Sequence, residues 1–290
     1  MEITEPGLRA HDCGKPPDVP DGQSMTMAAG PAIAARVSLL LDRVVAEAHR
    51  QLRPALHPYR ALLYLGLLMG LLLVLWLTSR FDDLELAVVM LGALYLAYEV
   101  LYLPVKRHVF GISVRSYLQD LVLFLLPAAI AMAAVTGTDL LGFLDVLGLF
   151  FALVVGFTRI GCFLGGCCYG MPSALGVRYP DRVFAPFEGG TCRRFTPPSD
   201  PGGRVFPIQL VDSAANFALA AGLFALLLSM GEPSGLSLPL YLLAYSAFRL
   251  GADFFRTSSS RPRYGPFSEA QLVAALVIVV CGGWVGVMLT

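Results

Sequence analysis

The chain has 290 residues, of which 56% are hydrophobic and 14% are charged, whereas soluble domains carry about 25% charged residues. Basic and acidic residues balance, so the formal net charge is zero. The sequence has no basic stripe with interleaved aromatic residues, which argues against nucleic acid as a partner. The composition is typical of an integral membrane protein.

Residues 1–58 precede the long apolar stretches. The first thirty are rich in proline, glycine and acidic or polar residues. They predict a mobile tail and not a signal peptide, because a signal peptide begins with a basic and then an apolar stretch. Residues 31–55 have the pattern of an amphipathic helix, which can lie on the membrane surface or pack against a bundle; the sequence favours neither. We therefore divide the chain into this N-terminal region, 1–58, and a transmembrane domain, 59–290.

Seven apolar stretches follow, each of about the length that a hydrocarbon core of ~30 Å requires, which is roughly 20 residues. In chain order they are residues 61–79, 86–105, 121–138, 140–158, 213–231, 236–255 and 270–290. Backbone polar groups find no water inside the bilayer, and these runs lack the alternation of barrel strands, so we expect helices. The predicted fold is an all-α bundle of seven transmembrane helices, with the link at residues 170–207 as a small extramembrane head.

Lysine and arginine near the span ends predict the orientation, because these residues stay on the cytoplasmic side. The side of the N-terminus carries fourteen of them, whereas the opposite side carries Arg80 alone. The fourteen are Arg50, Arg53, Arg60, Lys106, Arg107, Arg115, Arg178, Arg182, Arg193, Arg194, Arg204, Arg256, Arg261 and Arg263. We therefore expect the N-terminus and the head in the cytoplasm, a reducing compartment in which thiols stay free.

The fourth span runs into the stretch TRIGCFLGGCCYG, residues 158–170, which holds three cysteines. Part of the pattern has a packing interpretation, since glycines four apart let helices approach closely and buried cysteines are ordinary apolar residues. On an unbroken helix Cys162, Cys167 and Cys168 point in divergent directions, but a break at Gly165 and Gly166 can bring the sulfur atoms together. A thiolate beside an arginine is a better nucleophile or metal ligand, so we expect a chemical role for at least one thiol. A soft-metal site or redox pair is an alternative, although no Cys-x-x-Cys pair or histidine at zinc spacing supports a metal.

Arginines inside the spans indicate a functional site, because a charge in the membrane costs about 2.5–3.5 kcal/mol on insertion scales. Arg249, Asp253 and Arg256 are spaced i, i+4 and i+7, which places them on one helix face. The simpler alternative is that Arg249 and Asp253 only neutralise each other. The excess of cations, Arg159 and Arg249, instead predicts a polar cavity for an anionic head group such as phosphate, which guanidinium binds bidentately.

Two acidic residues inside the spans are more ambiguous. Asp145 lies fourteen residues before Arg159, about 21 Å away along a helix axis, so these two do not pair directly. Glu99 can contact a ligand or serve as the structural partner of an arginine, and the sequence does not decide between these roles.

With these residues the chain resembles the prolipoprotein diacylglyceryl transferase family. Its members are seven-span enzymes of the bacterial inner membrane that move a diacylglyceryl group from phosphatidylglycerol to a cysteine thiol of a lipoprotein precursor. The resemblance runs from about residue 140 to the C-terminus and more weakly back to residue 59. The family's signature, Gly-Arg-hydrophobic-Gly-Asn-Phe ending in Tyr/Trp-Gly, is matched by Arg159, Ile160, Gly161, Phe163, Gly166, Tyr169 and Gly170. An aspartate fourteen residues before the arginine resembles Asp145.

Two later stretches extend the resemblance. "FPIQLVD" is similar to the family's His-Pro-x-Gln-Leu-Tyr-Glu opening of the fifth span, which carries over Gln209 and sets Asp212 in the place of the glutamate. "YSAFRLGADFFR" is similar to the family's late arginine-bearing helix, which carries over Arg249 and Arg256. The family's following Ser-x-x-Gln-hydrophobic stretch resembles Ser268, Gln271 and Leu272.

The chain also departs from the family pattern. The signature's asparagine is Cys162 here and its glutamate is Cys167. The His-Gly-Gly-Leu motif of the third span, whose histidine is linked to catalysis in the family, is absent; its place falls near residues 117–120. His108 lies too far upstream to replace this histidine, and the fifth-span histidine is Phe206. An enzyme that needs a base to activate an acceptor thiol lacks the usual candidate here.

The predicted orientation departs as well, since the family's catalytic face is external. The arginines of the long head count less in the orientation rule, but nine against one remain without them. We therefore expect an inverted paralogue with a cytosolic substrate in the bacterial inner membrane.

The expected function is that of a membrane-embedded transferase of the diacylglyceryl transferase type. It moves a glyceryl or lipid group from an anionic, phosphatidylglycerol-like phospholipid to a thiol or other small acceptor, without metal or organic cofactor. Arg159 and Arg249 hold the phosphate, while Cys162, Cys167 or Cys168 acts as nucleophile, relay or acceptor-aligning group. The candidates for substrate binding are Asp145, Tyr169, Gln209, Asp212, Arg256 and Glu99.

Two alternative functions stay open. One is a true phosphatidylglycerol-prolipoprotein diacylglyceryl transferase with a substituted active site. The other is a non-catalytic membrane module that binds or transports a soft metal or a thiol compound.

Overall fold

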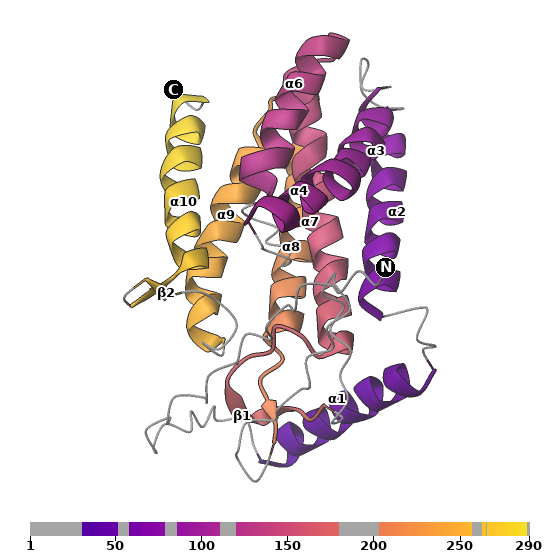
Figure 1. Ribbon diagram of the computed structural model, residues 1–290, viewed down its shortest axis with the longest axis vertical. Helices are drawn as coiled ribbons and strands as arrows, with labels where there is room; N and C mark the ends of the chain where they lie inside the picture. The colour runs from indigo at the N-terminus through magenta and orange to yellow at the C-terminus, as the bar shows by residue number, and fades with distance from the viewer. Residues whose placement is uncertain are drawn as a thin grey trace, which may run out of the picture.

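The structure is a computed structural model that describes residues 31–51, 58–78, 86–110, 120–179, 203–256, 263–264 and 266–288. The tail expected at residues 1–30 and much of the expected head, residues 180–202, lie outside these ranges. Figure 1 shows a bundle of long helices that run along the vertical axis, with one helix, α1 (Pro31–Gln51), lying across the lower end.

The bundle confirms the all-α membrane fold. Its helices are α2 (Pro58–Thr78), α3 (Ala87–Ala97) continued by the π-helical turn η1 (Tyr98–Tyr102) and α4 (Leu103–Phe110), the π-helical turn η2 (Leu121–Leu125) continued by α6 (Leu126–Thr136), α7 (Leu140–Gly165), α8 (Ile208–Met230), α9 (Ser237–Ala252) followed by the 3-10 turn η3 (Asp253–Phe255), and α10 (Glu269–Met288).

Five helices in the described ranges are long and apolar enough to cross a membrane: Pro58–Thr78, Ala87–Lys106, Leu140–Gly165, Ile208–Met230 and Ala270–Val287. The other two expected spans, at residues 121–138 and 236–255, form the shorter helices Leu121–Thr136 and Ser237–Ala252. The count of seven spans therefore stays a prediction.

Helix α7 is the centre of the bundle. Within its most apolar window 78% of the residues are buried, against 22–28% in the other four candidate spans. Its small residues allow this close packing: a Cβ atom on Gly148 would lie 2.6 Å from the backbone nitrogen of Leu238 in α9, and one on Gly161 would lie 2.9 Å from the Cα atom of Tyr59 in α2. The C-terminal end of α7, with Cys162, is thus enclosed by neighbouring helices.

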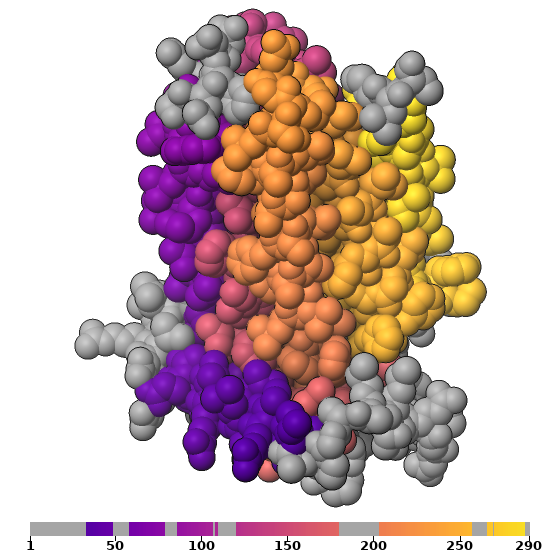
Figure 2. Space-filling model, turned by 180° about the vertical axis from the view of Figure 1, so that it is seen from behind, coloured from indigo at the N-terminus to yellow at the C-terminus, as the bar shows by residue number. Residues whose placement is uncertain are grey.

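The rear face of the molecule is formed by α8, which runs down the middle, with α9 and α10 beside it (Figure 2). Residues of α8 reach α7 across this contact, since Ser213 Oγ donates a hydrogen bond to the Gly156 carbonyl at 2.9 Å. Both helices begin or end at the lower side of the bundle, where the polar residues of the site gather.

Helix α1 packs on the lower end of the bundle through one face. Ser38 and Val45 are buried, and Asp42 accepts hydrogen bonds from the Arg178 backbone N–H at 2.8 Å and from the Arg204 guanidinium at 2.6 and 3.1 Å. The large apolar side chains exposed on the helix are Ile33, Val37, Leu39, Leu40 and Val44. The amphipathic helix expected in this region is therefore present and contacts the protein, with apolar residues left at its surface.

A short strand, β1 (Pro172–Val177), follows the cysteines and lies beside Val205. The backbone of Met171 donates to the Phe255 carbonyl and accepts from the Phe206 N–H, each at 2.9 Å. Strands β2 (Arg263–Tyr264) and β3 (Phe267–Ser268) form a small antiparallel hairpin before α10. These links hold the cysteine segment, the start of α8 and the end of α9 together.

Candidate active site

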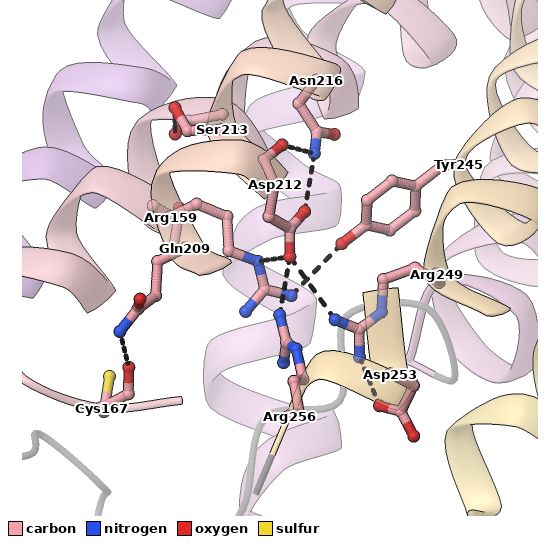
Figure 3. Close-up of polar contacts among 12 residues, drawn as sticks. Arg159, Cys167, Gln209, Asp212, Ser213, Asn216, Tyr245, Arg249, Asp253 and Arg256 are labelled. Atoms are coloured by element: carbon pink, nitrogen blue, oxygen red, sulfur yellow. Dashed lines mark hydrogen bonds and ion pairs between the residues drawn. The ribbon is translucent and has the colours of Figure 1, made fainter. Parts of the chain in front are cut away.

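Three arginines from separate elements converge on one carboxylate, that of Asp212 in α8 (Figure 3). The Oδ2 atom of Asp212 lies 2.9 Å from Nε of Arg159, 3.5 Å from Nη1 of Arg249 and 2.8 Å from Nη2 of Arg256. Asp212 is fully buried and the three guanidinium groups are nearly so. We call these four residues the arginine cluster.

The second oxygen of Asp212 is held from its own helix. Asn216 Nδ2 donates to Oδ1 of Asp212 at 3.1 Å and in turn accepts, on its Oδ1, the hydroxyl of Tyr241 at 2.9 Å. The neighbouring Tyr245 hydroxyl accepts a hydrogen bond from Arg159 Nη2 at 3.2 Å. The two tyrosine rings stack, with centroids 5.5 Å apart, so α9 supports both the carboxylate and one of its arginines.

Positive charge exceeds negative charge in this cluster. Within the described residues one further carboxylate contacts these arginines, that of Asp253, whose Oδ1 lies 3.8 Å from Arg249 Nη2, so three guanidinium groups face two carboxylates. Burial lowers the pKa of Arg256 to about 10, and the charges of Arg249 and Arg159 act in the same direction. A buried site with an excess of guanidinium groups attracts an anion.

Some polar atoms of the site have no hydrogen-bond partner within the described residues. They include Nε of Arg159, which is near Asp212 but whose N–H is not directed at the oxygen, and Nε of Arg256. Gln209 Oε1 and Ser246 Oγ are also buried without a hydrogen-bond partner among the described residues. Buried polar atoms are usually satisfied, so these are the atoms at which a polar ligand would gain most.

The backbone that carries Arg256 into the cluster is extended, whereas the sequence predicted a helix. The expected helix through residue 255 ends at Ala252, where η3 tightens the last turn, and Arg256 is extended and pairs with Gly170 in a β-bridge. The i, i+7 helix face is therefore wrong for Arg256. The strand-like pairing instead brings it toward Asp212, next to the cysteine segment.

The three cysteines come together as the helix break predicts. Helix α7 ends at Gly165, Gly166 adopts the left-handed conformation with φ of 70°, and the chain turns so that the sulfur atoms of Cys162, Cys167 and Cys168 all lie within 4.8 Å of one another. Gln209 Nε2 donates to the Cys167 carbonyl at 2.7 Å, which ties this turn to the start of α8. We call these three residues the cysteine cluster.

The thiols of the cluster differ in pKa. Hydrogen bonding with Cys162 and Cys167 lowers the pKa of Cys168 well below its usual range, and the charges of Arg256 and Arg159 add to this effect. Hydrogen bonding with Cys162 and Cys168 raises the pKa of Cys167, as does its burial. Cys168 is partly exposed, whereas the other two are buried. Charges of the arginine cluster therefore act on a thiol of the cysteine cluster.

The remaining predicted residues lie elsewhere. Asp145 accepts backbone N–H hydrogen bonds from Ser234, Gly235 and Ser237 at 2.7–2.9 Å, so it fixes the start of α9 at the far end of α7. Glu99 lies half-buried in η1.

Tyr169, predicted to orient the lipid, is part of the aromatic packing below the bundle. Its ring lies 6.4 Å from that of Tyr179, centroid to centroid, and burial raises its pKa. The Tyr179 hydroxyl donates to the Phe163 carbonyl at 2.9 Å. Tyr169 thus lies beside the cysteine cluster in sequence, packed against the segment that carries it.

Comparison with known proteins identifies the family. The family model described as prolipoprotein diacylglyceryl transferase matches residues 48–288. The chain belongs to the prolipoprotein diacylglyceryl transferase family.

Two curated relatives agree with this membership. The chain is 33% identical over 145 residues to a phosphatidylglycerol-prolipoprotein diacylglyceryl transferase of Clostridium tetani (strain Massachusetts / E88), an alignment that covers 49% of this chain and 51% of the relative. It is 31% identical over 131 residues to phosphatidylglycerol-prolipoprotein diacylglyceryl transferase 2 of Clostridium perfringens (strain 13 / Type A), which covers 44% of each protein. The chain spans about half the length of the curated relatives it matches.

Sequence reasoning missed a second buried ion pair. It lies near residues 117–120, the position that corresponds to the family's His-Gly-Gly-Leu motif. Asp120 is buried and accepts hydrogen bonds from the hydroxyls of Tyr98 at 2.8 Å and Tyr102 at 3.0 Å, and it pairs with Lys106. The aspartate also lines an otherwise apolar cavity between α2, α3 and α7. The available signal was a lysine and an aspartate at the facing ends of two successive apolar stretches, but their pairing depends on how η1 and η2 face each other.

Proposed function

We propose that this member of the prolipoprotein diacylglyceryl transferase family is an enzyme that moves a diacylglyceryl group from an anionic phospholipid to a thiol acceptor. The observation that carries the proposal is the convergence of three buried arginines on Asp212, with one positive charge in excess. The names of the two relatives support phosphatidylglycerol as the donor.

The chemistry explains why arginines are needed. The acceptor sulfur forms a bond to the terminal carbon of the diacylglyceryl group, while the bond between that carbon and the phosphate oxygen breaks. The thiol proton is released, and the phosphate leaves as a monoester that carries more negative charge than the diester did. Guanidinium groups placed where this charge develops stabilise the transition state more than the bound lipid.

Asp212 organises the arginines before the lipid arrives. Like charges would drive three guanidinium groups apart, and one shared carboxylate holds them within 3.5 Å of a single oxygen. Because Asp253 contacts Arg249 alone among the three arginines, at 3.8 Å, and also accepts a hydrogen bond from Ser268 Oγ, the cluster retains the capacity to bind one more anion. The donor phosphate is our candidate for that anion.

The acceptor supplies its own thiol, so we assign the cysteine cluster to aligning and activating this acceptor. Cys168 is partly exposed, and the charges of Arg256 and Arg159 help to lower the pKa of its thiol. The acceptor thiol and the leaving phosphate would then be bound by adjacent sets of residues, the thiol by the cysteine cluster and the phosphate by the arginine cluster.

The test is an assay of the purified full chain in detergent with phosphatidylglycerol and a cysteine peptide, followed by mass spectrometry of the glyceryl thioether. We expect Arg159→Ala and Arg249→Ala to lower turnover by roughly 100-fold or more and to stay folded, because Asp212 keeps two guanidinium partners. The matched control is Arg204→Ala, which removes a partly exposed arginine that pairs with Asp42 instead. Full turnover in either cluster variant would show that the arginines do not hold the donor.

The acceptor distinguishes the two family-level possibilities. Turnover with a peptide that carries a lipoprotein-precursor cysteine motif favours a true prolipoprotein diacylglyceryl transferase. Turnover with small cytosolic thiols alone favours the paralogue.

We also propose that the cysteine-bearing end of the bundle faces the cytoplasm. Met171 and Glu232 are exposed residues near opposite ends of the bundle. A membrane-impermeant thiol reagent applied to intact cells should label Glu232→Cys and not Met171→Cys. Labelling of Met171→Cys alone would establish the external orientation.

A further inference from the structure

We propose that Cys162, Cys167 and Cys168 bind a zinc ion, and that the open fourth position of this ion receives the acceptor thiol. The inference rests on the proposed function for the identity of the acceptor. Its metal-binding part is independent of that function, because it follows from the cysteine cluster itself.

The geometry fits a thiophilic ion. Four ligands at about 2.3 Å around zinc place neighbouring sulfur atoms about 3.8 Å apart. The three sulfur atoms of the cluster lie within 4.8 Å of one another, so even the widest pair needs to close by only about 1 Å, which small side-chain rotations supply. Two of the residues are buried and Cys168 is partly exposed, so the ion would sit at the edge of the core.

The kind and number of ligands select the metal class. Three thiolates suit soft or borderline ions such as zinc and do not suit magnesium or calcium, which take oxygen ligands. No histidine, aspartate, glutamate or further cysteine from the described ranges joins the group. Structural zinc sites have four protein ligands, whereas catalytic zinc sites have three and leave one position for water or substrate. Three cysteines therefore favour a site with an open position.

The backbone is shaped to hold this arrangement. Cys168 has a φ of 57° and is the only non-glycine residue with positive φ in the described ranges. Such a conformation is unfavourable for a residue with a side chain and persists where the surroundings fix it. Here the Cys167 N–H donates to the Cys162 carbonyl at 3.1 Å and Gln209 binds the Cys167 carbonyl. The strained turn is what directs the third sulfur toward the other two.

Neighbouring charge also favours the complex. Zinc with three thiolates carries one net negative charge, and a fourth thiolate raises this to two. Arg159 lies three residues before Cys162 on α7, and Arg256 pairs with Gly170 just beyond Cys168. Two cationic residues therefore adjoin the cysteine cluster along the backbone, and an anionic complex is stabilised by cations near it.

The bound ion would activate the acceptor thiol by favouring its deprotonated form. When the acceptor thiol coordinates zinc, its proton is released to solvent and the sulfur stays as a bound thiolate at neutral pH. This sulfur then forms the bond to the diacylglyceryl carbon, the carbon–oxygen bond to phosphate breaks, and the phosphate monoester is held by the arginine cluster. The thioether product is a weak ligand and leaves the ion. No oxidation or reduction takes place.

The first experiment counts metal on the full chain in a background in which the other cysteines, Cys13, Cys192 and Cys281, are serine. After chelation and reloading with Zn(II) or Cd(II), we expect one ion per chain by elemental analysis and an ultraviolet cadmium–thiolate absorption. Cys168→Ser, at a partly exposed position, and Cys167→Ser should each lower affinity by at least roughly tenfold. Thermal unfolding of each apo variant shows that the loss is not a folding defect. Equal metal content in the variants and their background would overturn the site.

The second experiment tests the open position. X-ray absorption at the zinc edge should show three sulfur ligands in the loaded protein and four after a cysteine peptide is added, with a serine peptide as the control. An unchanged sulfur count would overturn the activation of the acceptor and leave a structural ion. Neither readout needs phospholipid, so failure of the proposed transferase activity would be recognised separately, by absent turnover in a protein that binds zinc normally.

Discussion

Because Asp212 holds three arginines, its substitution should lower the stability of the protein by an amount that can be worked out. Asp212→Asn keeps the shape of the side chain and its contact with Asn216 but removes the one charge that all three guanidinium groups share. The excess of positive charge in the cluster rises from one to two. Removal of one partner from a buried ion pair costs about 3–5 kcal/mol, which corresponds to a decrease of roughly 6–20 °C in melting temperature for a domain of this size.

The assay is thermal unfolding in detergent, followed with a dye that reacts with thiols as the buried cysteines become exposed. The matched control is Asp42→Asn, because Asp42 also pairs with an arginine, Arg204, but at the partly exposed contact of α1. That pair should contribute less than about 1 kcal/mol.

Added inorganic phosphate sharpens the test. An anion that binds the folded state raises stability by mass action, by about 2.7 kcal/mol at a hundred times its dissociation constant. Since Asp212→Asn has the larger excess of positive charge, phosphate should raise its melting temperature more than that of the unaltered protein. The reasoning is refuted if Asp212→Asn melts no lower than Asp42→Asn and phosphate stabilises all three proteins equally.

Further predictions concern the scaffold. Gly148→Ala should destabilise the bundle by about 1–3 kcal/mol, because its Cβ atom would meet the α9 backbone at 2.6 Å, while Gly92→Ala, with nothing within 4 Å, should not; equal melting temperatures would contradict this packing. Asp145→Ala should cost roughly 2–4 kcal/mol in unfolding free energy, because three backbone N–H groups at the start of α9 lose their acceptor. Arg204→Ala should speed amide hydrogen exchange in Pro31–Gln51, where it removes the bidentate contact to Asp42, and unchanged exchange would show that other contacts hold α1.

The features that the sequence predicted correctly are those set by local chemistry. The break after α7 follows from two adjacent glycines, and the convergence of the three cysteines follows from that break. The apolar spans are likewise visible because a bilayer requires continuous hydrophobic length.

The features that were missed depend on pairing between distant helices. Asn216 and Tyr241 support Asp212 only because α8 and α9 lie side by side, and neither residue type marks a site by itself. Asp145 looked like a site residue because a charge inside a span usually is one, yet its carboxylate binds the backbone of the turn before α9. The position of Arg256 was wrong in the same sense, since a β-bridge to Gly170 replaced the expected helix.

The two π-helical turns, η1 and η2, have a consequence for how this part of the chain can change. A π-helical turn holds one residue more than the α-helix around it, and it rotates every side chain that follows by about 100° relative to an uninterrupted helix. Loss of a single residue from Tyr98–Tyr102 would restore the regular helix and turn Lys106 away from Asp120. A one-residue deletion within this segment would therefore leave the buried Asp120 carboxylate without its cation inside the apolar interior.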